Sequence, residues 1–154
     1  IQKLKCKYTS LQTLLKKSDI ITLHLPDNKF THHILNSKTL KLVKRGAVLI
    51  NTARGGVIDT TALIKAMRNR TIVSAGLDVL EGECIVKEEK ALLNPEFMKS
   101  CDLKNVLQNN ILLRKPNVYI TPHNAFNSKE ALQRILDTTV DNIKAIKKPI
   151  NKVK

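Results

Sequence analysis

The chain has 154 residues, 42% of them hydrophobic, which suits a single folded domain or a piece of a larger protein. No apolar run approaches the roughly 20 residues that a membrane-spanning helix needs, and the basic start shows no secretory leader, so no membrane partner is expected. The formal net charge of +14 would suit nucleic acid or an anionic surface, but the basic residues are scattered and only 3% of residues are aromatic. A specific nucleic-acid partner is therefore not expected.

Cysteine usage points to a reducing compartment. Cys6, Cys84 and Cys101 are far apart and odd in number, so they fit neither a zinc pattern nor a disulfide framework. We therefore expect a cytoplasmic protein.

Apolar strands alternate with amphipathic segments along the chain. The expected strands are 20–25, 47–52, 72–79 and 118–121. The expected helices are a short one after Ser10, residues 36–43, one capped by Asp59, and a long one that begins with a capping box of Asn127 and Glu130. This alternation predicts an α/β fold with a parallel sheet. Residues 84–115 break the rhythm and are interpreted as an insertion over the active face.

Chemically useful side chains follow three of these strands. Arg54 follows the run Val48-Leu49-Ile50-Asn51-Thr52-Ala53, Asp78 lies at the end of the next strand with Glu83 beyond it, and His123 follows the last. Parallel strands end at one edge of a sheet, so these groups should converge there. Taken singly, Arg54 could be an ordinary surface residue and His123 a structural histidine. Their convergence favours an active site.

Several of these segments resemble one enzyme family. They are VLINTARGGVID (48–59), GLDVLEGE (76–83), TPHNA (121–125), SDIITLHLP (18–26) and NSKEALQRILDT (127–138). The chain closely resembles the D-isomer-specific 2-hydroxyacid dehydrogenases, and the D-lactate dehydrogenase group most nearly. The resemblance implies a Rossmann-like, partial doubly wound domain over residues 1–126. Residues 127–154 would form a helix that returns toward a substrate domain, with a basic tail.

The resemblance also implies roles for individual residues. Arg54 would bind the substrate carboxylate, His123 would act as the general acid/base, and Glu83 would pair with that histidine. A neighbouring carboxylate favours the imidazolium form and fixes the tautomer, which suits a proton donor. Asp78 would contact the nicotinamide end of NAD. The other positions that would line the NAD site are Leu25, Pro26, Thr31, Thr52 and Ala53, together with Arg54.

Other ionisable residues near these motifs have no implied role. Glu81 competes with Glu83 as the partner of the histidine, but it is interpreted as a solvated loop charge. His24 is expected to pack at a strand end, while His32 and His33 are expected to lie on the surface.

One family feature is missing from the sequence. None of the five glycines is spaced as G-x-G-x-x-G, the loop that lets a backbone approach the pyrophosphate. The chain is therefore interpreted as a fragment of an NAD-dependent enzyme that interconverts a 2-oxo acid and a D-2-hydroxy acid, with pyruvate and D-lactate as the leading pair. The intact enzyme is expected to be a homodimer. The alternatives are a dinucleotide-binding regulator without turnover and, less favoured, a basic nucleic-acid-binding module.

Overall fold

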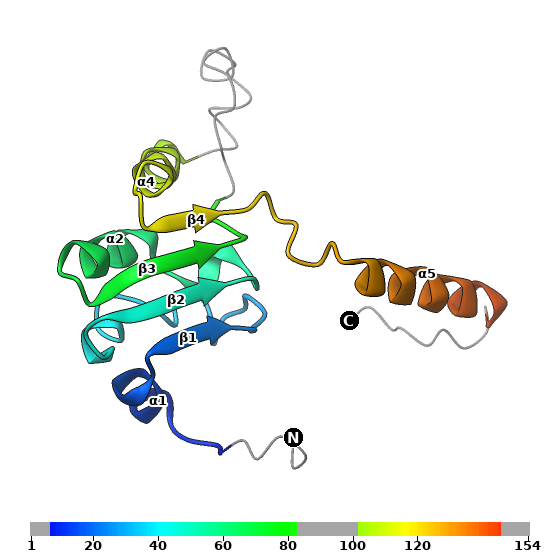
Figure 1. Ribbon diagram of the computed structural model, residues 1–154, viewed down its shortest axis with the longest axis horizontal. Helices are drawn as coiled ribbons and strands as arrows, with labels where there is room; N and C mark the ends of the chain where they lie inside the picture. The colour runs from blue at the N-terminus through cyan, green and yellow to red at the C-terminus, as the bar shows by residue number, and fades with distance from the viewer. Residues whose placement is uncertain (1–6, 83–101, 146–154) are drawn as a thin grey trace. The chain divides into compact units, whose positions relative to one another are not determined.

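The computed structural model describes residues 7–82 and 102–145. The chain divides into two compact units, residues 1–123 and 124–154. The first unit is built on a four-stranded parallel sheet of β1 (Ile20–Leu23), β2 (Ala47–Asn51), β3 (Ile72–Leu77) and β4 (Val118–Ile120). The strands lie in the order in which they follow one another in the chain (Figure 1). This arrangement confirms the predicted Rossmann-like α/β class.

Capped helices precede the strands β1 and β3. Helix α1 (Leu11–Lys17) starts at Ser10, whose hydroxyl accepts a hydrogen bond from the Thr13 amide, and α2 (Thr60–Arg68) starts at Asp59, whose carboxylate accepts from Ala62. Such side-chain caps satisfy amide groups that the helix itself leaves unpaired. A 3₁₀ turn (Leu40–Leu42) precedes β2, and a second (Gly55–Val57) joins β2 to α2.

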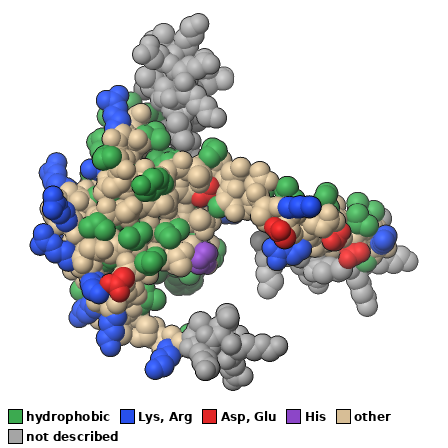
Figure 2. All heavy atoms as spheres, viewed as in Figure 1, with side chains coloured by type: hydrophobic (Ala, Val, Ile, Leu, Met, Phe, Trp, Pro, Cys, Tyr) green, Lys and Arg blue, Asp and Glu red, His purple; other side chains and the backbone are tan. Residues whose placement is uncertain are grey.

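The hydrophobic core lies where α2 packs against β3. Leu49, Leu63, Ile72 and Ala75 are at most 1% exposed. The strands carry apolar side chains on the opposite face of the sheet as well, including Ile20 at 63% exposure and Tyr119 at 69%. Hydrophobic side chains are visible over the strands in Figure 2.

The segment expected to be an insertion contains a helix that belongs to the fold. Helix α4 (Leu103–Leu113) begins at Asp102 and packs against α2 and β4, with Val106 and Leu112 buried. Residues 103–113 therefore form the crossover helix between β3 and β4 and do not cover the active face. The mixed polar sequence concealed this role, because α4 buries only a narrow stripe. Residues 84–101 of the predicted insertion lie outside the described residues.

Two other local predictions were wrong. Residues 36–43 form turns and a single 3₁₀ turn in place of a helix, because the Asn36 side chain accepts hydrogen bonds from the amides of Lys38 and Thr39. The long helix α5 (Lys129–Lys144) is capped by Ser128, whose hydroxyl accepts from the Ala131 amide, and not by Asn127.

Helix α5 makes up most of the described part of the second unit. Its apolar side chains recur at helical spacing, as the sequence predicted, and none of its residues is buried. Among the described residues, no helix combines the length and the apolar character needed to cross a membrane.

Candidate active site

Three neighbouring loops meet at the carboxyl edge of the sheet, where β2, β3 and β4 end (Figure 1). They carry Arg54, Asp78 and His123, respectively. Two backbone hydrogen bonds join the loops at their bases: the Asp78 amide donates to the Asn51 carbonyl at 2.9 Å, and the Thr121 amide donates to the Leu77 carbonyl at 3.1 Å. The structure therefore brings these three predicted site residues to one edge of the sheet.

Arg54 is held through its main chain, while its side chain is exposed. The side chain of Asn51, 1% exposed, donates to the Arg54 carbonyl at 2.9 Å and accepts from the Ala53 amide at 3.0 Å. The guanidinium Nη1 donates to the Ala53 carbonyl at 2.7 Å. Asn51 thus fixes the turn that presents the arginine, and a guanidinium can grip a carboxylate through two parallel hydrogen bonds.

Asp78 is a buried carboxylate at the end of β3, 5% exposed. The Thr121 hydroxyl, which comes from the end of β4, donates a hydrogen bond to its Oδ1. A buried carboxylate needs such donors, because transfer from water is costly for an unpaired charge. The pair of Asp78 and Thr121 therefore ties two strand ends together at the site.

His123 is exposed and has an unusual backbone conformation. Its φ of +53° lies in the left-handed region, which is uncommon for a residue with a side chain, and its amide donates to the Thr121 carbonyl at 2.9 Å. Backbone strain of this kind concentrates at functional sites. Glu83, the expected partner of this histidine, lies outside the described residues.

The positions expected to line the NAD site are in the loops after β1 and β2. Thr31 is half-buried, and its hydroxyl donates to the Pro26 carbonyl at 2.5 Å, which closes the loop after β1. Leu25 and Ala53 are half-buried, and Thr52 is exposed. These contacts shape the loops, and the NAD-lining role of the five residues stays a prediction.

Two residues without a predicted role prove to be structurally important. Glu81 is not a solvated loop charge: its side chain is 17% exposed, and its Oε1 lies 2.6 Å from Nε2 of His33. His33 in turn is half-buried, with 35% of its side chain exposed, and is therefore more enclosed than the sequence predicted. Sequence reasoning missed the pair because 48 residues separate its members. The one local signal was the place of Glu81 inside the motif GLDVLEGE (76–83); nothing in the sequence around His33 marked it as the partner.

A parallel sheet whose carboxyl edge presents an arginine, a buried aspartate and an exposed histidine is typical of α/β folds of the dinucleotide-binding type. Comparison with known families gives the particular family. Residues 1–125 match the model of the D-isomer specific 2-hydroxyacid dehydrogenase, NAD binding domain. The chain therefore belongs to this family.

Individual relatives agree with this assignment. A D-specific alpha-keto acid dehydrogenase of Enterococcus faecium is 39% identical over 142 residues, which are 90% of this chain and 41% of the relative. A glyoxylate reductase of Thermococcus litoralis is 37% identical over 147 residues, 96% of this chain and 38% of the relative. The chain thus spans about two fifths of the length of these relatives.

Solved structures place the fold in the same family. The D-lactate dehydrogenase of Aquifex aeolicus, crystallised with NAD and lactic acid, is 41% identical with a TM-score of 0.76. The match covers 94% of this chain and 42% of that one. The Lactobacillus delbrueckii D-isomer specific 2-hydroxyacid dehydrogenase in its NAD-complexed form is 35% identical with a TM-score of 0.74, over 96% and 43% of the two chains. The resemblance to the D-lactate dehydrogenase group is confirmed.

The chemistry of the site fits one end of a nicotinamide dinucleotide. The Asp78 carboxylate and the Thr121 hydroxyl offer an acceptor and a polar neighbour suited to a carboxamide, and Thr52 adds an exposed hydroxyl. The pyrophosphate end has no such counterpart, because this sequence holds no G-x-G-x-x-G loop.

Proposed function

We propose that the chain carries the catalytic half of an NAD-dependent oxidoreductase that interconverts a 2-oxo acid and a D-2-hydroxy acid. The observation that supports this most directly is the convergence of Arg54, Asp78 and His123 at one sheet edge in a chain of this family. Pyruvate and D-lactate are the leading substrate pair, since the relatives of known structure include a D-lactate dehydrogenase bound to lactic acid.

Arg54 binds the substrate in this proposal. Its exposed guanidinium grips the carboxylate and draws electron density from the adjacent carbonyl, so that the carbonyl carbon becomes more electrophilic. Asn51 holds the backbone of the turn from which the Arg54 side chain extends.

His123 supplies the proton in the direction of reduction. Its imidazolium donates a proton to the carbonyl oxygen as that oxygen gains negative charge, and the neutral ring takes the proton back in oxidation. Glu83 pairs with the ring and stabilises the charged form. When bound, NADH supplies the hydride for the carbonyl carbon, and Asp78 with the loop residues Leu25, Pro26, Thr31, Thr52 and Ala53 holds the nicotinamide end.

A non-catalytic regulator of the same fold is the alternative, and the presence of Arg54, Glu83 and His123 together counts against it. The homodimer and the cytoplasmic location stay predictions for the whole protein.

Turnover tests the proposal. The test uses a fusion in which the upstream half of the Aquifex aeolicus relative precedes this chain; we call this fusion the joined enzyme. Its proposed catalytic residues all come from this chain. We expect pyruvate-dependent oxidation of NADH with D-lactate as the product, and parallel assays with glyoxylate and longer 2-oxo acids rank the substrates. A folded joined enzyme that oxidises NADH with none of these acids would refute the proposal, and the 154-residue chain alone should show no turnover.

A further inference from the structure

The 3₁₀ turn that follows Arg54, Gly55–Val57, is called the Arg54 turn below. Loops on both sides of it confine this turn. A methyl group added at Gly55 would clash with the backbone carbonyl of Leu80, in the loop after β3. One added at Gly56 would clash with the carboxylate of Asp27, in the loop after β1. The turn after Arg54 therefore packs closely against the loops after β1 and β3.

The ion pair of His33 and Glu81 joins the same two loops. Nε2 of His33 lies 2.6 Å from Oε1 of Glu81, and the two side chains are 35% and 17% exposed. The second carboxylate oxygen of Glu81 accepts a hydrogen bond from the Thr60 amide at 3.0 Å, at the first residue of α2. One carboxylate thus connects the loop after β1, the loop after β3 and the helix that follows the Arg54 turn.

His33 also contacts the Arg54 turn through its backbone. Its amide donates to the Gly56 carbonyl at 2.8 Å, and the Leu35 amide donates to the Val57 carbonyl at 3.1 Å. These bonds hold His33 at a φ of +49°, in the left-handed region that residues with side chains rarely adopt. The ring of His32 stacks on that of His33 with centroids 4.1 Å apart, and Nδ1 of His32 lies 3.1 Å from Oδ1 of Asp27.

We propose that the pair of His33 and Glu81 is a latch that positions Arg54 for the substrate carboxylate. This inference rests on the proposed function, because it assigns the latch to the substrate-binding step. A bidentate grip on a carboxylate depends on the placement of the guanidinium, so a loosened turn weakens substrate binding even though Arg54 itself is unchanged. His33 and Glu81 act through Arg54 and are positioning residues.

A purely structural ion pair would behave differently. Its loss would lower the free energy of unfolding but leave the KM for pyruvate unchanged in the enzyme that remains folded. Loss of a positioning latch raises the KM for pyruvate and leaves the KM for NADH unchanged, because Arg54 contacts the carboxylate.

The experiment compares His33→Leu with two matched variants of the joined enzyme. His33→Gln keeps an N–H donor toward Glu81. Its cost for the left-handed backbone conformation is similar to that of His33→Leu, so the two variants differ mainly in the donor. Lys44→Met removes an ion pair at the opposite edge of the sheet, where Nζ of Lys44 lies 2.5 Å from Oδ1 of Asp19. We expect the KM for pyruvate to rise about five- to tenfold in His33→Leu, as for loss of one ordinary hydrogen bond. In His33→Gln, the KM for pyruvate should return most of the way to the value of the unmodified enzyme. In Lys44→Met, the KM for pyruvate should equal that value.

Amide hydrogen exchange gives a readout that does not depend on turnover. The Ile58 amide donates to the Gly55 carbonyl at 3.1 Å, so its exchange reports the Arg54 turn directly. We expect faster exchange at Ile58 in His33→Leu than in the unmodified or Lys44→Met proteins, in both the joined enzyme and the 154-residue chain. Unchanged exchange, or faster exchange with an unchanged KM for pyruvate, would overturn the latch. A folded joined enzyme without turnover would refute the proposed function, and the exchange rates would then decide separately whether the pair holds the turn.

Discussion

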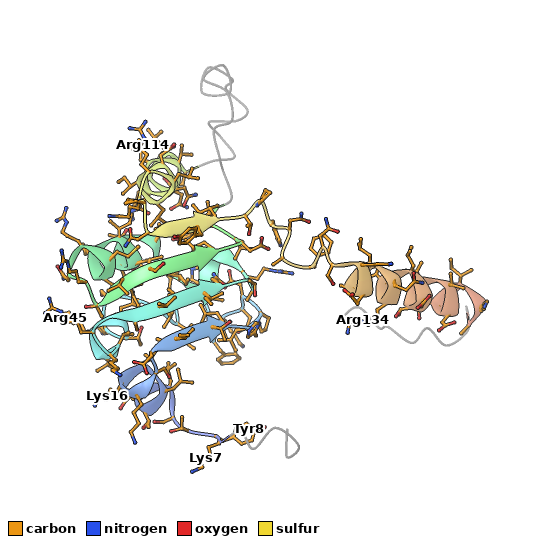
Figure 3. The ribbon with its side chains drawn as sticks, in the orientation of Figure 1. Lys7, Tyr8, Lys16, Arg45, Arg114 and Arg134 are labelled. Atoms are coloured by element: carbon orange, nitrogen blue, oxygen red, sulfur yellow. The ribbon has the colours of Figure 1, made fainter. Side chains whose placement is uncertain are left out.

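The two edges of the sheet carry their charged side chains in different ways. At the carboxyl edge, Asp78 is buried and accepts a hydrogen bond from the Thr121 hydroxyl, and Glu81 is half-buried against His33. At the amino edge, the basic side chains are exposed, and Lys16, Arg45 and Arg114 all lie on the side where the strands begin (Figure 3). The amino edge therefore carries many exposed basic side chains, whereas the acidic side chains of the carboxyl edge are held in place by hydrogen bonds.

The exposed charges of the amino edge have a structural explanation. Helices α1 and α2 end there with basic residues in their last turns, namely Lys16 and Lys17 in α1 and Lys65 and Arg68 in α2. Cations at a helix C-terminus interact favourably with the helix dipole. The net charge of +14 therefore does not by itself mark a functional surface. Burial and bonds between distant segments are more informative.

The largest difference between the edges should appear when His123 is replaced. His123→Ala removes the proposed proton donor, and we expect kcat/KM of the joined enzyme to fall by about 10²- to 10⁴-fold, the usual contribution of general acid catalysis. Lys44→Met at the amino edge serves as the control and should leave kcat/KM unchanged. A His123→Ala enzyme with kcat/KM comparable to the unmodified one would contradict the assigned mechanism.

Replacing Arg54 should act mainly on the substrate. Arg54→Ala removes the carboxylate grip, so we expect a rise in the KM for pyruvate of roughly tenfold or more, because charged hydrogen bonds are lost. Arg54→Lys keeps the charge but not the planar fork, and should recover only part of the loss. Steady-state kinetics with pyruvate and NADH varied separately measure this. An unchanged KM for pyruvate would show that Arg54 does not bind the substrate carboxylate.

The stability of the two edges should differ more modestly. Asn51 is buried and bonds to both Ala53 and Arg54, so Asn51→Ala should lower the free energy of unfolding by about 1–3 kcal/mol. The ion pair of Lys44 and Asp19 is exposed, and Lys44→Met should cost about 0–1 kcal/mol. Urea denaturation of the joined enzyme compares the two. Equal losses in the free energy of unfolding would contradict the expected difference in stability between the two edges.

The smallest expected effect concerns nucleic acid. If the basic side chains of the amino edge have no specific partner, DNA binding should be weak at low salt and fall steeply as salt rises, since it depends on counterion release. Fluorescence titration with duplex DNA at increasing salt measures this, and Arg45→Gln should weaken whatever binding exists only slightly. Tight binding that persists at physiological salt would restore the rival interpretation of a nucleic-acid-binding module.

Local signals in the sequence predicted most of the fold. Buried strands such as 47–52 are continuous apolar runs, and Asp59 combines a cap with the start of an amphipathic helix, so neighbouring residues contain the information. The same signals failed at residues 36–43, where the Asn36 side chain competes for backbone amides. They also failed at α4, whose place between β3 and β4 is set by its packing against α2.

The sequence by itself determined the family and the presence of Arg54, Asp78 and His123 after successive strands, because motif and periodicity are properties of short segments. Tertiary structure alone decided how these residues are held. The bond from Thr121 to Asp78 and the pair of His33 and Glu81 join residues 43 and 48 positions apart. No local pattern encodes such pairs, because they form only when parallel strands bring their carboxyl ends together.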